Sequence, residues 1–143
     1  MIRAFIDASV IYASIISPTG AARELLRRHT TGEVQLVVSD YVLEEVERNL
    51  KAKNPDNAGS VKFLLGILAL EIVEVDVTEI KAAAEYTEPK DAPVVAAAQK
   101  GNCEYLLTFD KKHLLGKELL VQRSGVKIIT PGDLMQILRE KKS

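Results

Sequence analysis

Cysteine is almost absent from this chain, which has only Cys103, and tryptophan is missing altogether. A single cysteine excludes an intramolecular disulfide and a cysteine-based zinc site. Cys103 comes just before the apolar stretch Tyr105–Leu107, where a buried thiol usually acts as a small apolar side chain. Aromatic residues make up only 5% of the chain. The core must therefore be built mainly from isoleucine, leucine, valine and alanine.

Net charge and long apolar runs are lacking as well. The formal charge is −1, so the protein as a whole does not attract nucleic acid, and an RNA-binding surface must be a local patch or a groove formed by an oligomer. The stretch Phe63–Leu70 is less than half of a membrane span. Met1–Ile6 is too short for the apolar region of a signal peptide. With 47% hydrophobic and 27% charged residues, we expect a single soluble domain over residues 1–143, in the cytoplasm and without membrane contact.

Short, mostly continuous apolar runs alternate with segments of helical character. Continuous runs are typical of parallel strands that are covered on both faces. Strands are predicted over Ile2–Ile6, Val34–Val38, Glu71–Val75, Tyr105–Leu107 and Val126–Ile129, and helices over Ala21–Arg28, Tyr41–Leu50, Ala92–Lys100 and Gly132–Lys141. This alternation predicts an α/β fold, a doubly wound parallel sheet with helices on both faces.

Two consecutive segments in the middle of the chain have opposite character. The polar stretch Lys51–Ser60 is typical of a surface loop. The stretch Val61–Leu70 is apolar on nearly every helical face. It is either a buried helix or a surface that meets another copy of the protein, and the second possibility predicts a homodimer.

Three aspartates are expected at one edge of the predicted sheet. Ligands of open α/β sheets bind beyond the carboxyl ends of the strands, near the point where the strand order reverses. Asp7 directly follows the first strand, and Asp110 lies three residues beyond Leu107. If the first and fourth strands are neighbours, these two side chains emerge side by side. Asp91 begins the helix that leads into the fourth strand, and such a helix starts at the same edge.

A fourth carboxylate is expected from the helix over Tyr41–Leu50. Its apolar row consists of Val42, Val46 and Leu50, widened by Leu43. Glu44 points nearly opposite this row, whereas Glu45 and Glu47 flank it. A metal ligand must reach inward past the rim, which disfavours Glu44. Spacing alone leaves both Glu45 and Glu47 open.

Clustered carboxylates without histidine or cysteine partners favour Mg²⁺ or Mn²⁺ over zinc or copper. A divalent cation relieves their mutual repulsion, and such sites perform phosphoryl chemistry. Each residue also has a purely structural interpretation. Asp91 is in position to cap its helix, and Asp110 to cap a short helix over Lys111–Leu115. Asp7 is the hardest to explain in this way, because a carboxylate directly after a buried strand is costly without a partner.

Four short motifs resemble those of the PIN-domain nucleases, and especially of the small stand-alone toxins of the VapC kind. The motifs are Phe5–Val10 (FIDASV), Val42–Val46 (VLEEV), Pro89–Val94 (PKDAPV) and Leu106–Asp110 (LLTFD). Each motif is short, but their order, spacing and surroundings match over essentially the whole chain. The resemblance implies a three-layer α/β/α sandwich around a five-stranded parallel sheet. It also implies a Mg²⁺- or Mn²⁺-dependent endoribonuclease, in which a metal-activated water attacks an RNA phosphodiester.

The resemblance also assigns residues and partners. It places the acidic metal ligands on Asp7, Glu45, Asp91 and Asp110. It selects Glu45 over Glu47, because the glutamate of the family immediately precedes an aliphatic residue, here Val46. Ser9 and Thr108 fall where the family often carries small hydroxyl residues near the metal. Toxins of this kind are usually silenced by a small antitoxin, which is therefore a possible partner.

Other classes of protein explain the acidic residues less well. A phosphoacceptor receiver domain needs two adjacent acids after the first strand, where this chain has Asp7-Ala8. A phosphatase of the haloacid-dehalogenase type needs a second aspartate at the position of Ser9. The serious alternative is a PIN-like module that binds RNA or protein with little or no cleavage. For substrate phosphates, Lys111 and Lys112 are the best candidates because they adjoin Asp110. His29 and His113 are expected at the surface rather than as general bases.

Overall fold

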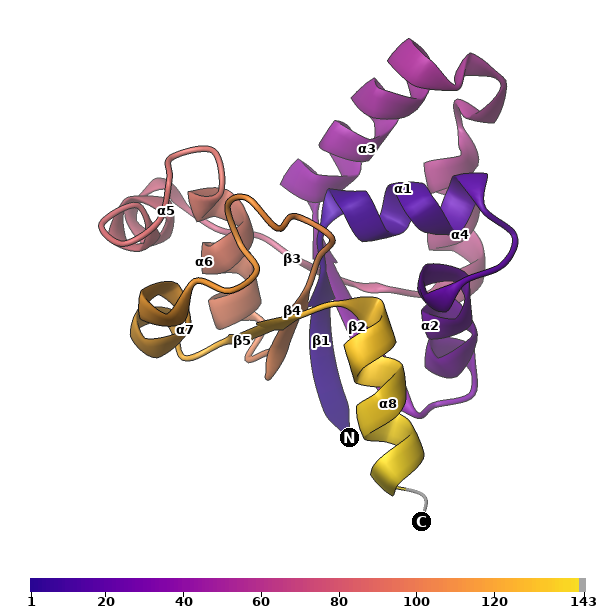
Figure 1. Ribbon diagram of the computed structural model, residues 1–143. Coiled ribbons are helices and arrows are strands. Elements are labelled where there is room, and N and C mark those ends of the chain that lie inside the picture. The colour runs from indigo at the N-terminus through magenta and orange to yellow at the C-terminus, as the bar shows by residue number, and fades with distance from the viewer. Residues whose placement is uncertain (142–143) are drawn as a thin grey trace.

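The computed structural model describes residues 1–141, and a five-stranded parallel sheet runs through its centre (Figure 1). The strand order is β3-β2-β1-β4-β5. The strands are β1 (Ile2–Ile6), β2 (Val34–Ser39), β3 (Glu71–Val73), β4 (Tyr105–Leu107) and β5 (Lys127–Ile129), and every neighbouring pair is parallel. The predicted doubly wound parallel sheet is confirmed.

Helices cover both faces of this sheet and form a three-layer α/β/α sandwich. They are α1 (Ala8–Ile16), α2 (Ala21–Thr30), α3 (Asp40–Lys53), α4 (Ser60–Leu68), α5 (Val77–Ala83), α6 (Ala92–Lys100), α7 (Glu118–Ser124) and α8 (Pro131–Lys141), with a short 3-10 helix η1 (Pro55–Asn57) between α3 and α4. In Figure 1, α5, α6 and α7 lie on one side of the sheet, and α1, α2 and α8 on the other. Helix α3 extends beyond the carboxyl ends of the strands in the same view.

The apolar runs of the sequence form the core, as their continuity predicts. In β1 the side chains of Ala4, Phe5 and Ile6 are completely buried, because helices cover the strand on both faces. Helix α6 is rich in alanine, and all residues of its segment 92–98 are buried. A Cβ added at Gly101, just after α6, would lie 3.2 Å from side-chain atoms of Val37 and Val73. Small residues therefore let α6 lie close against the centre of the sheet.

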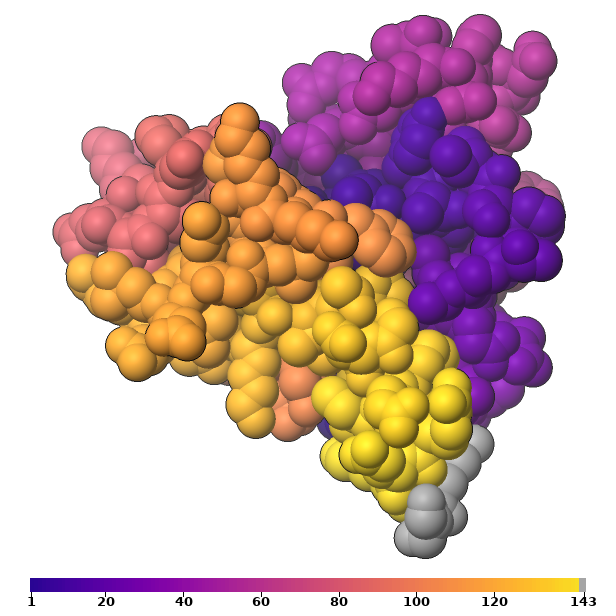
Figure 2. Space-filling model, in the orientation of Figure 1, coloured from indigo at the N-terminus to yellow at the C-terminus, as the bar shows by residue number. Residues whose placement is uncertain are grey.

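The surface view shows the same placement of helices on two sides of the sheet (Figure 2). Figure 2 shows orange atoms of α7 and of the loop before it on one side, and indigo to magenta atoms of α1–α4 on the other. Yellow atoms of α8 cover the lower part between them. Among residues 1–141, no helix combines the length and the apolar character that a membrane crossing requires.

The two middle segments differ in part from their predicted form. The loop predicted over Lys51–Ser60 contains the last turn of α3 and the short helix η1, so that prediction was wrong in detail. The apolar segment that follows forms α4, but this helix is buried on one side only. Phe63 is 69% exposed and Ile67 is 59% exposed. The possibility of a fully buried helix is thereby ruled out, and α4 presents an uncovered apolar surface.

Candidate active site

The strand order reverses between β1 and β4, and this is where Asp7 and Asp110 emerge. Ile6 pairs with Leu107 in the register of these strands, and the amide of Asp7 donates to the carbonyl of Leu107 at 3.0 Å. The two loops that follow β1 and β4 therefore begin side by side at the carboxyl edge of the sheet. The predicted neighbourhood of the first and fourth strands is confirmed.

Asp7 is a buried carboxylate that is held by three donors. Its Oδ1 accepts the backbone N–H of Ala8 at 2.7 Å, which caps α1. Its Oδ2 accepts the hydroxyl of Thr108 at 2.7 Å and, more weakly, that of Ser9 at 3.4 Å. Burial raises the pKa of Asp7 despite these donors, and the charge of Asp110 raises it further. The side chain is thus fixed in direction while its charge stays only partly compensated.

Ser9 and Thr108 also tie the two loops to each other. The Oγ of Ser9 accepts the amide of Phe109 at 3.1 Å, and the Oγ1 of Thr108 accepts the amide of Asp110 at 3.0 Å. Thr108 is completely buried. Both hydroxyl groups thus lie against the carboxylate of Asp7, and the function near a metal that the family resemblance implies for them stays a prediction.

Asp110 differs from Asp7 because backbone donors stabilise its charge. Its Oδ1 accepts the amides of Lys112 and His113, both at 3.0 Å. Burial acts to raise the pKa of Asp110, but the donors from His113 and Lys112 and the nearby imidazole outweigh it and lower the pKa. The residues that follow form a turn and not the short helix of the structural interpretation. Asp110 therefore caps a turn with one oxygen, and its Oδ2 lies 3.4 Å from Nδ1 of His113.

Asp91 directly precedes α6, but its side chain does not cap that helix. Its side chain accepts no hydrogen bond from the helix, and its buried Oδ2 has no hydrogen-bond partner. Burial raises the pKa of Asp91, against the opposing charge of Lys90, and Asp110 and Asp7 raise it further. A buried, unpartnered carboxylate oxygen is costly for a folded protein. Helix capping therefore does not explain why a buried carboxylate stands at this position.

The glutamates of α3 separate clearly in space. Glu45 is half-buried. Burial is the largest cause of its raised pKa, and the negative charges of Asp7 and Asp91 raise the pKa further, while the positive charge of Arg48 acts to lower it. Glu47 instead extends toward α4, where its Oε1 accepts the amide of Gly59 at 3.4 Å. Glu44 is exposed, as its position on the helix predicts. Glu45 is thus coupled electrostatically to Asp7 and Asp91.

The four acids are therefore electrostatic neighbours drawn from four segments of the chain. In the part of the chain that the structure describes, no three His, Cys, Asp or Glu side chains are close enough to hold one ion as they stand. The four acids fit a divalent cation by the chemistry of their oxygen donors and by their negative charge. Burial, more than mutual repulsion, raises the pKa values of Asp7, Glu45 and Asp91, and the unpartnered oxygen of Asp91 is a free hard donor. These residues suit Mg²⁺ or Mn²⁺.

Two basic residues other than Lys111 and Lys112 place their side chains near the acids. Lys111 and Lys112 are exposed, and in residues 1–141 their ammonium groups form no ion pair. Lys90 and His113 lie against the acids instead. Nζ of Lys90 is 3.9 Å from Oδ1 of Asp91 and 3.1 Å from Nδ1 of His113. The position of Lys90 directly before Asp91 is a signal that sequence analysis could have used. His113 is half-buried, so its expected place at the surface was wrong.

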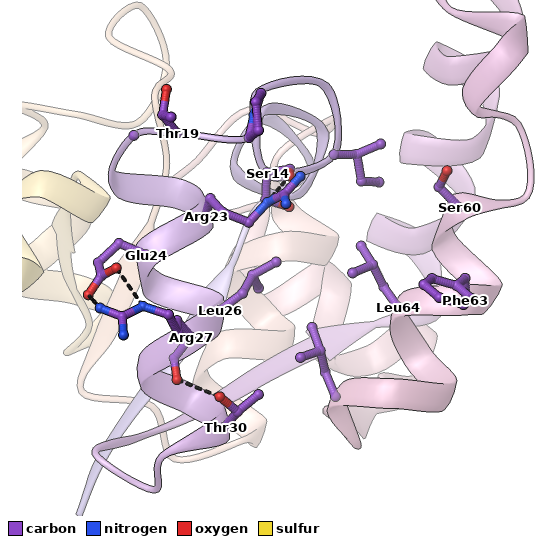
Figure 3. Close-up of a pocket in the computed structure, with 14 residues that line it drawn as sticks. Ser14, Thr19, Arg23, Glu24, Leu26, Arg27, Thr30, Ser60, Phe63 and Leu64 are labelled. Carbon is purple, nitrogen blue, oxygen red and sulfur yellow. Dashed lines mark hydrogen bonds and ion pairs between the residues drawn. The ribbon is translucent and has the colours of Figure 1, made fainter.

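A hollow lies away from the acids, between α2 and α4. It is a groove of about 630 Å³ that also includes the end of α1. Figure 3 shows Leu26 of α2 and Leu64 of α4 pointing toward each other across it, with Phe63 beside them on α4. Arg23 reaches back to the carbonyl of Ser14 at 2.7 Å. The groove is thus apolar at its centre and charged at its rim.

The fold and the arrangement of acids define a class, a three-layer α/β domain with carboxylates at the switch point of its sheet. Residues 3–112 match the family described as PIN domain, and the chain belongs to this family. The recognition of a PIN domain from the four motifs is confirmed. No curated relative matches the chain significantly in sequence.

Solved structures confirm the fold at low sequence identity. The structure of PAE2754 from Pyrobaculum aerophilum has a TM-score of 0.63 at 18% identity, covering 97% of this chain and 96% of that one. VapBC2 from Rickettsia felis, bound to a promoter DNA fragment, has a TM-score of 0.62 at 16% identity, covering 90% and 97%. VapC20 from Mycobacterium tuberculosis, a toxin that cleaves the sarcin-ricin loop, has a TM-score of 0.58 at 17% identity, covering 76% and 91%.

Proposed function

We propose that this protein is a Mg²⁺- or Mn²⁺-dependent endoribonuclease that acts as the toxin of a toxin–antitoxin pair. The observation that carries the proposal is the gathering of buried, electrostatically coupled carboxylates at the β1/β4 switch point. Membership of the PIN-domain family and the likeness to VapC20, a toxin that cleaves the sarcin-ricin loop, support it.

Asp7, Glu45, Asp91 and Asp110 would hold the cation, and each is prepared for this in a different way. When bound, a divalent cation supplies positive charge that activates water and stabilises the departing oxygen of a phosphodiester. Ser9 and Thr108 donate to Asp7 and hold its carboxylate toward the loop after β4. Backbone amides hold Asp110, while Asp91 keeps one oxygen without a partner. Hydrogen bonds thus fix the directions of Asp7 and Asp110, which lowers the cost of binding, while the four acids would still have to move closer together around an ion.

The first experiment measures cleavage of a structured RNA with Mg²⁺, with Mn²⁺ and with excess EDTA. We expect cleavage with either cation and none in EDTA. Asp7→Asn, purified in the same way, should lose about 100-fold or more of the activity, because it removes a charged ligand from the site. Equal activity in the variant and the parent would show that the cleavage comes from a contaminant or another site.

The second candidate function is a PIN-like module that binds RNA or protein without cleaving. The absence of any three acids close enough to share an ion in residues 1–141 is the observation that favours it. Isothermal titration of the protein with Mn²⁺ separates the two candidates. A nuclease binds the ion at the acids, so the heat of binding disappears in Asp7→Asn. A pure binding module retains RNA affinity but shows no such heat.

The groove between α2 and α4 is our candidate surface for the antitoxin. An apolar centre of this size fits one side of a helix, and the exposed Phe63 and the half-buried Leu64 of α4 lie beside it. Relatives of similar fold were solved as complexes, among them VapBC2 and FitAB. We therefore propose that an apolar segment of the antitoxin fills this groove. The homodimer that the segment Val61–Leu70 predicts would compete for the same surface, and it stays a prediction.

Phe63→Asp should weaken antitoxin binding about tenfold or more, because it places a charge at an apolar interface. The partner for this measurement is the antitoxin that the proposal requires, which is sought first as a small protein encoded next to this chain. Leu119→Asp is the matched control, since Leu119 is 62% exposed and does not line the groove. Both side chains are exposed, so neither change should unfold the protein. A parent that sediments as a dimer, together with a monomeric Phe63→Asp, would assign the groove to a second copy and overturn the antitoxin proposal.

A further inference from the structure

Lys90 is held at the rim of the acidic site by contacts at both of its ends. Its carbonyl accepts the hydroxyl of Tyr41, on α3, at 3.2 Å. Its ammonium lies 3.1 Å from Nδ1 of His113, in the loop after β4, and 3.9 Å from Oδ1 of Asp91. The side chain is nonetheless 55% exposed. Lys90 thus spans the space between α3 and the β4 loop while its charge stays open to solvent.

His113 explains why the ammonium of Lys90 is in this place. The imidazole stands between Asp110, with Nδ1 3.4 Å from Oδ2, and Glu88, with Nε2 3.6 Å from Oε2. It therefore joins the loop before α6 to the loop after β4. The distance of 3.9 Å from Lys90 to Asp91 is too long for a hydrogen bond. The ammonium of Lys90 therefore lies near the acids without a hydrogen bond to the carboxylate of Asp91.

The influence of the Lys90 charge extends over three of the four acids. It acts to lower the pKa of Asp91, and also those of Glu45 and Asp110, which come from separate segments. An acidic site repels the phosphate backbone of RNA, and a protein of net charge −1 offers no general attraction to offset this. Besides the proposed divalent cation, a positively charged side chain at the rim would offset this repulsion for the neighbouring phosphates, and Lys90 is placed to supply it.

We propose that the ammonium of Lys90 contacts a backbone phosphate of the RNA substrate beside the four acids. This inference rests on the proposed nuclease function. A lysine suits the task because its compact charge sits on a flexible stem, so it can turn from His113 to a phosphate without moving the loop. The contact is to the backbone and carries no sequence preference.

The test measures RNA binding by fluorescence anisotropy in the Asp7→Asn background, over a range of salt concentrations. Adding Lys90→Met should weaken binding about tenfold and reduce the slope of log affinity against log salt by about one. Lys90→Arg should retain most of the affinity. Lys100→Met is the matched control, because Lys100 is 44% exposed and pairs with Glu79 on the outer surface. We expect no change from it.

Kinetics in the otherwise unchanged protein complete the test. Lys90→Met should raise KM more than it lowers kcat, whereas Mn²⁺ affinity without RNA should stay equal or increase. An unchanged salt slope together with altered Mn²⁺ affinity would make Lys90 a mere counterion of the acids and overturn the inference. Absence of cleavage in the parent would refute the nuclease function alone, because the binding measurement does not depend on turnover.

Discussion

Replacing Asp91 with asparagine is expected to stabilise the metal-free protein at neutral pH and to slow RNA cleavage by a factor on the order of 10²–10³. The Oδ2 of Asp91 is buried without a hydrogen-bond partner, and burial raises the pKa of this carboxyl. Its charge therefore costs folding free energy, and the neutral amide avoids that cost. We expect a gain of about 1 kcal/mol, which corresponds to a rise in Tm of roughly 3 °C, measured by calorimetry in EDTA.

The pH dependence of this gain follows from the direction of the pKa shift. The carboxyl of Asp91 has a higher pKa in the folded than in the unfolded protein. The parent therefore binds a proton more readily when folded, and it gains stability as the pH falls through the folded pKa. The amide introduced by Asp91→Asn has no such titration. The advantage of the variant should be full above the folded pKa and should vanish as the pH falls to the ordinary value of an aspartate.

Divalent cations should reverse the order of stability. A ligand that binds only the folded state stabilises it, by about 2.7 kcal/mol at a concentration 100 times its Kd. Mg²⁺ or Mn²⁺ should thus raise the Tm of the parent, while Asp91→Asn should respond weakly. Cleavage should fall by a factor on the order of 10²–10³ through loss of a charged ligand. A variant that is less stable than the parent in EDTA would show that Asp91 serves the fold rather than a ligand.

The layout of the sheet could be predicted because its strands are buried on both faces. Continuous apolar runs such as Ile2–Ile6 and Tyr105–Leu107 have the bounds that the sequence predicts. Helix α6 was predicted equally well, because Asp91 precedes it, Pro93 lies in its first turn and Gly101 follows its last residue. The PIN-domain recognition, the parallel sheet and the neighbourhood of the first and fourth strands are confirmed.

Three helices, α1, α5 and α7, were not predicted from the sequence, although the capping box of Asp76 and Glu79 marks the start of α5. Helix α1 follows β1 without a break, and Asp7, which caps it, is also the first candidate ligand. Helices α5 and α7 have only seven residues each, too few to show a clear helical period. Their positions depend on packing against α6 and the sheet, which no short window of sequence reveals.

Topology predicts where two of the acids emerge, but not which basic side chains lie beside them. The positions of Asp7 and Asp110 follow from strand ends, which topology brings together. The position of Lys90 depends instead on His113, which is 23 residues away in the chain. That contact forms only when the loop before α6 meets the loop after β4. Lys111 and Lys112 were chosen because they adjoin Asp110 in the sequence, and adjacency in the sequence does not reveal the contact between Lys90 and His113.

Glu45→Gln and Glu47→Gln form a matched pair whose outcomes should differ widely. Both side chains are half-buried on α3, two residues apart, and both substitutions remove one negative charge. Glu45 is coupled to Asp7 and Asp91, whereas Glu47 accepts the amide of Gly59 near α4. Glutamine at position 47 keeps this acceptor. We expect Glu45→Gln to lose on the order of 100-fold in cleavage rate and Glu47→Gln to stay close to the parent.

The same pair should also separate metal binding from stability. In isothermal titration with Mn²⁺, Glu45→Gln should bind more weakly, because a neutral oxygen is a poorer ligand for a hard cation than a carboxylate. The unfolding of Glu45→Gln in EDTA should require slightly more denaturant than that of the parent, since burial and the nearby aspartates raise the pKa of Glu45. Glu44→Gln, on the exposed side of α3, should change neither quantity.

A loss of cleavage in Glu47→Gln with full activity in Glu45→Gln would place the fourth ligand one-half turn further along α3. The assignment taken from the family pattern would then be wrong at this helix, while the three aspartates at the edge of the sheet would be unaffected.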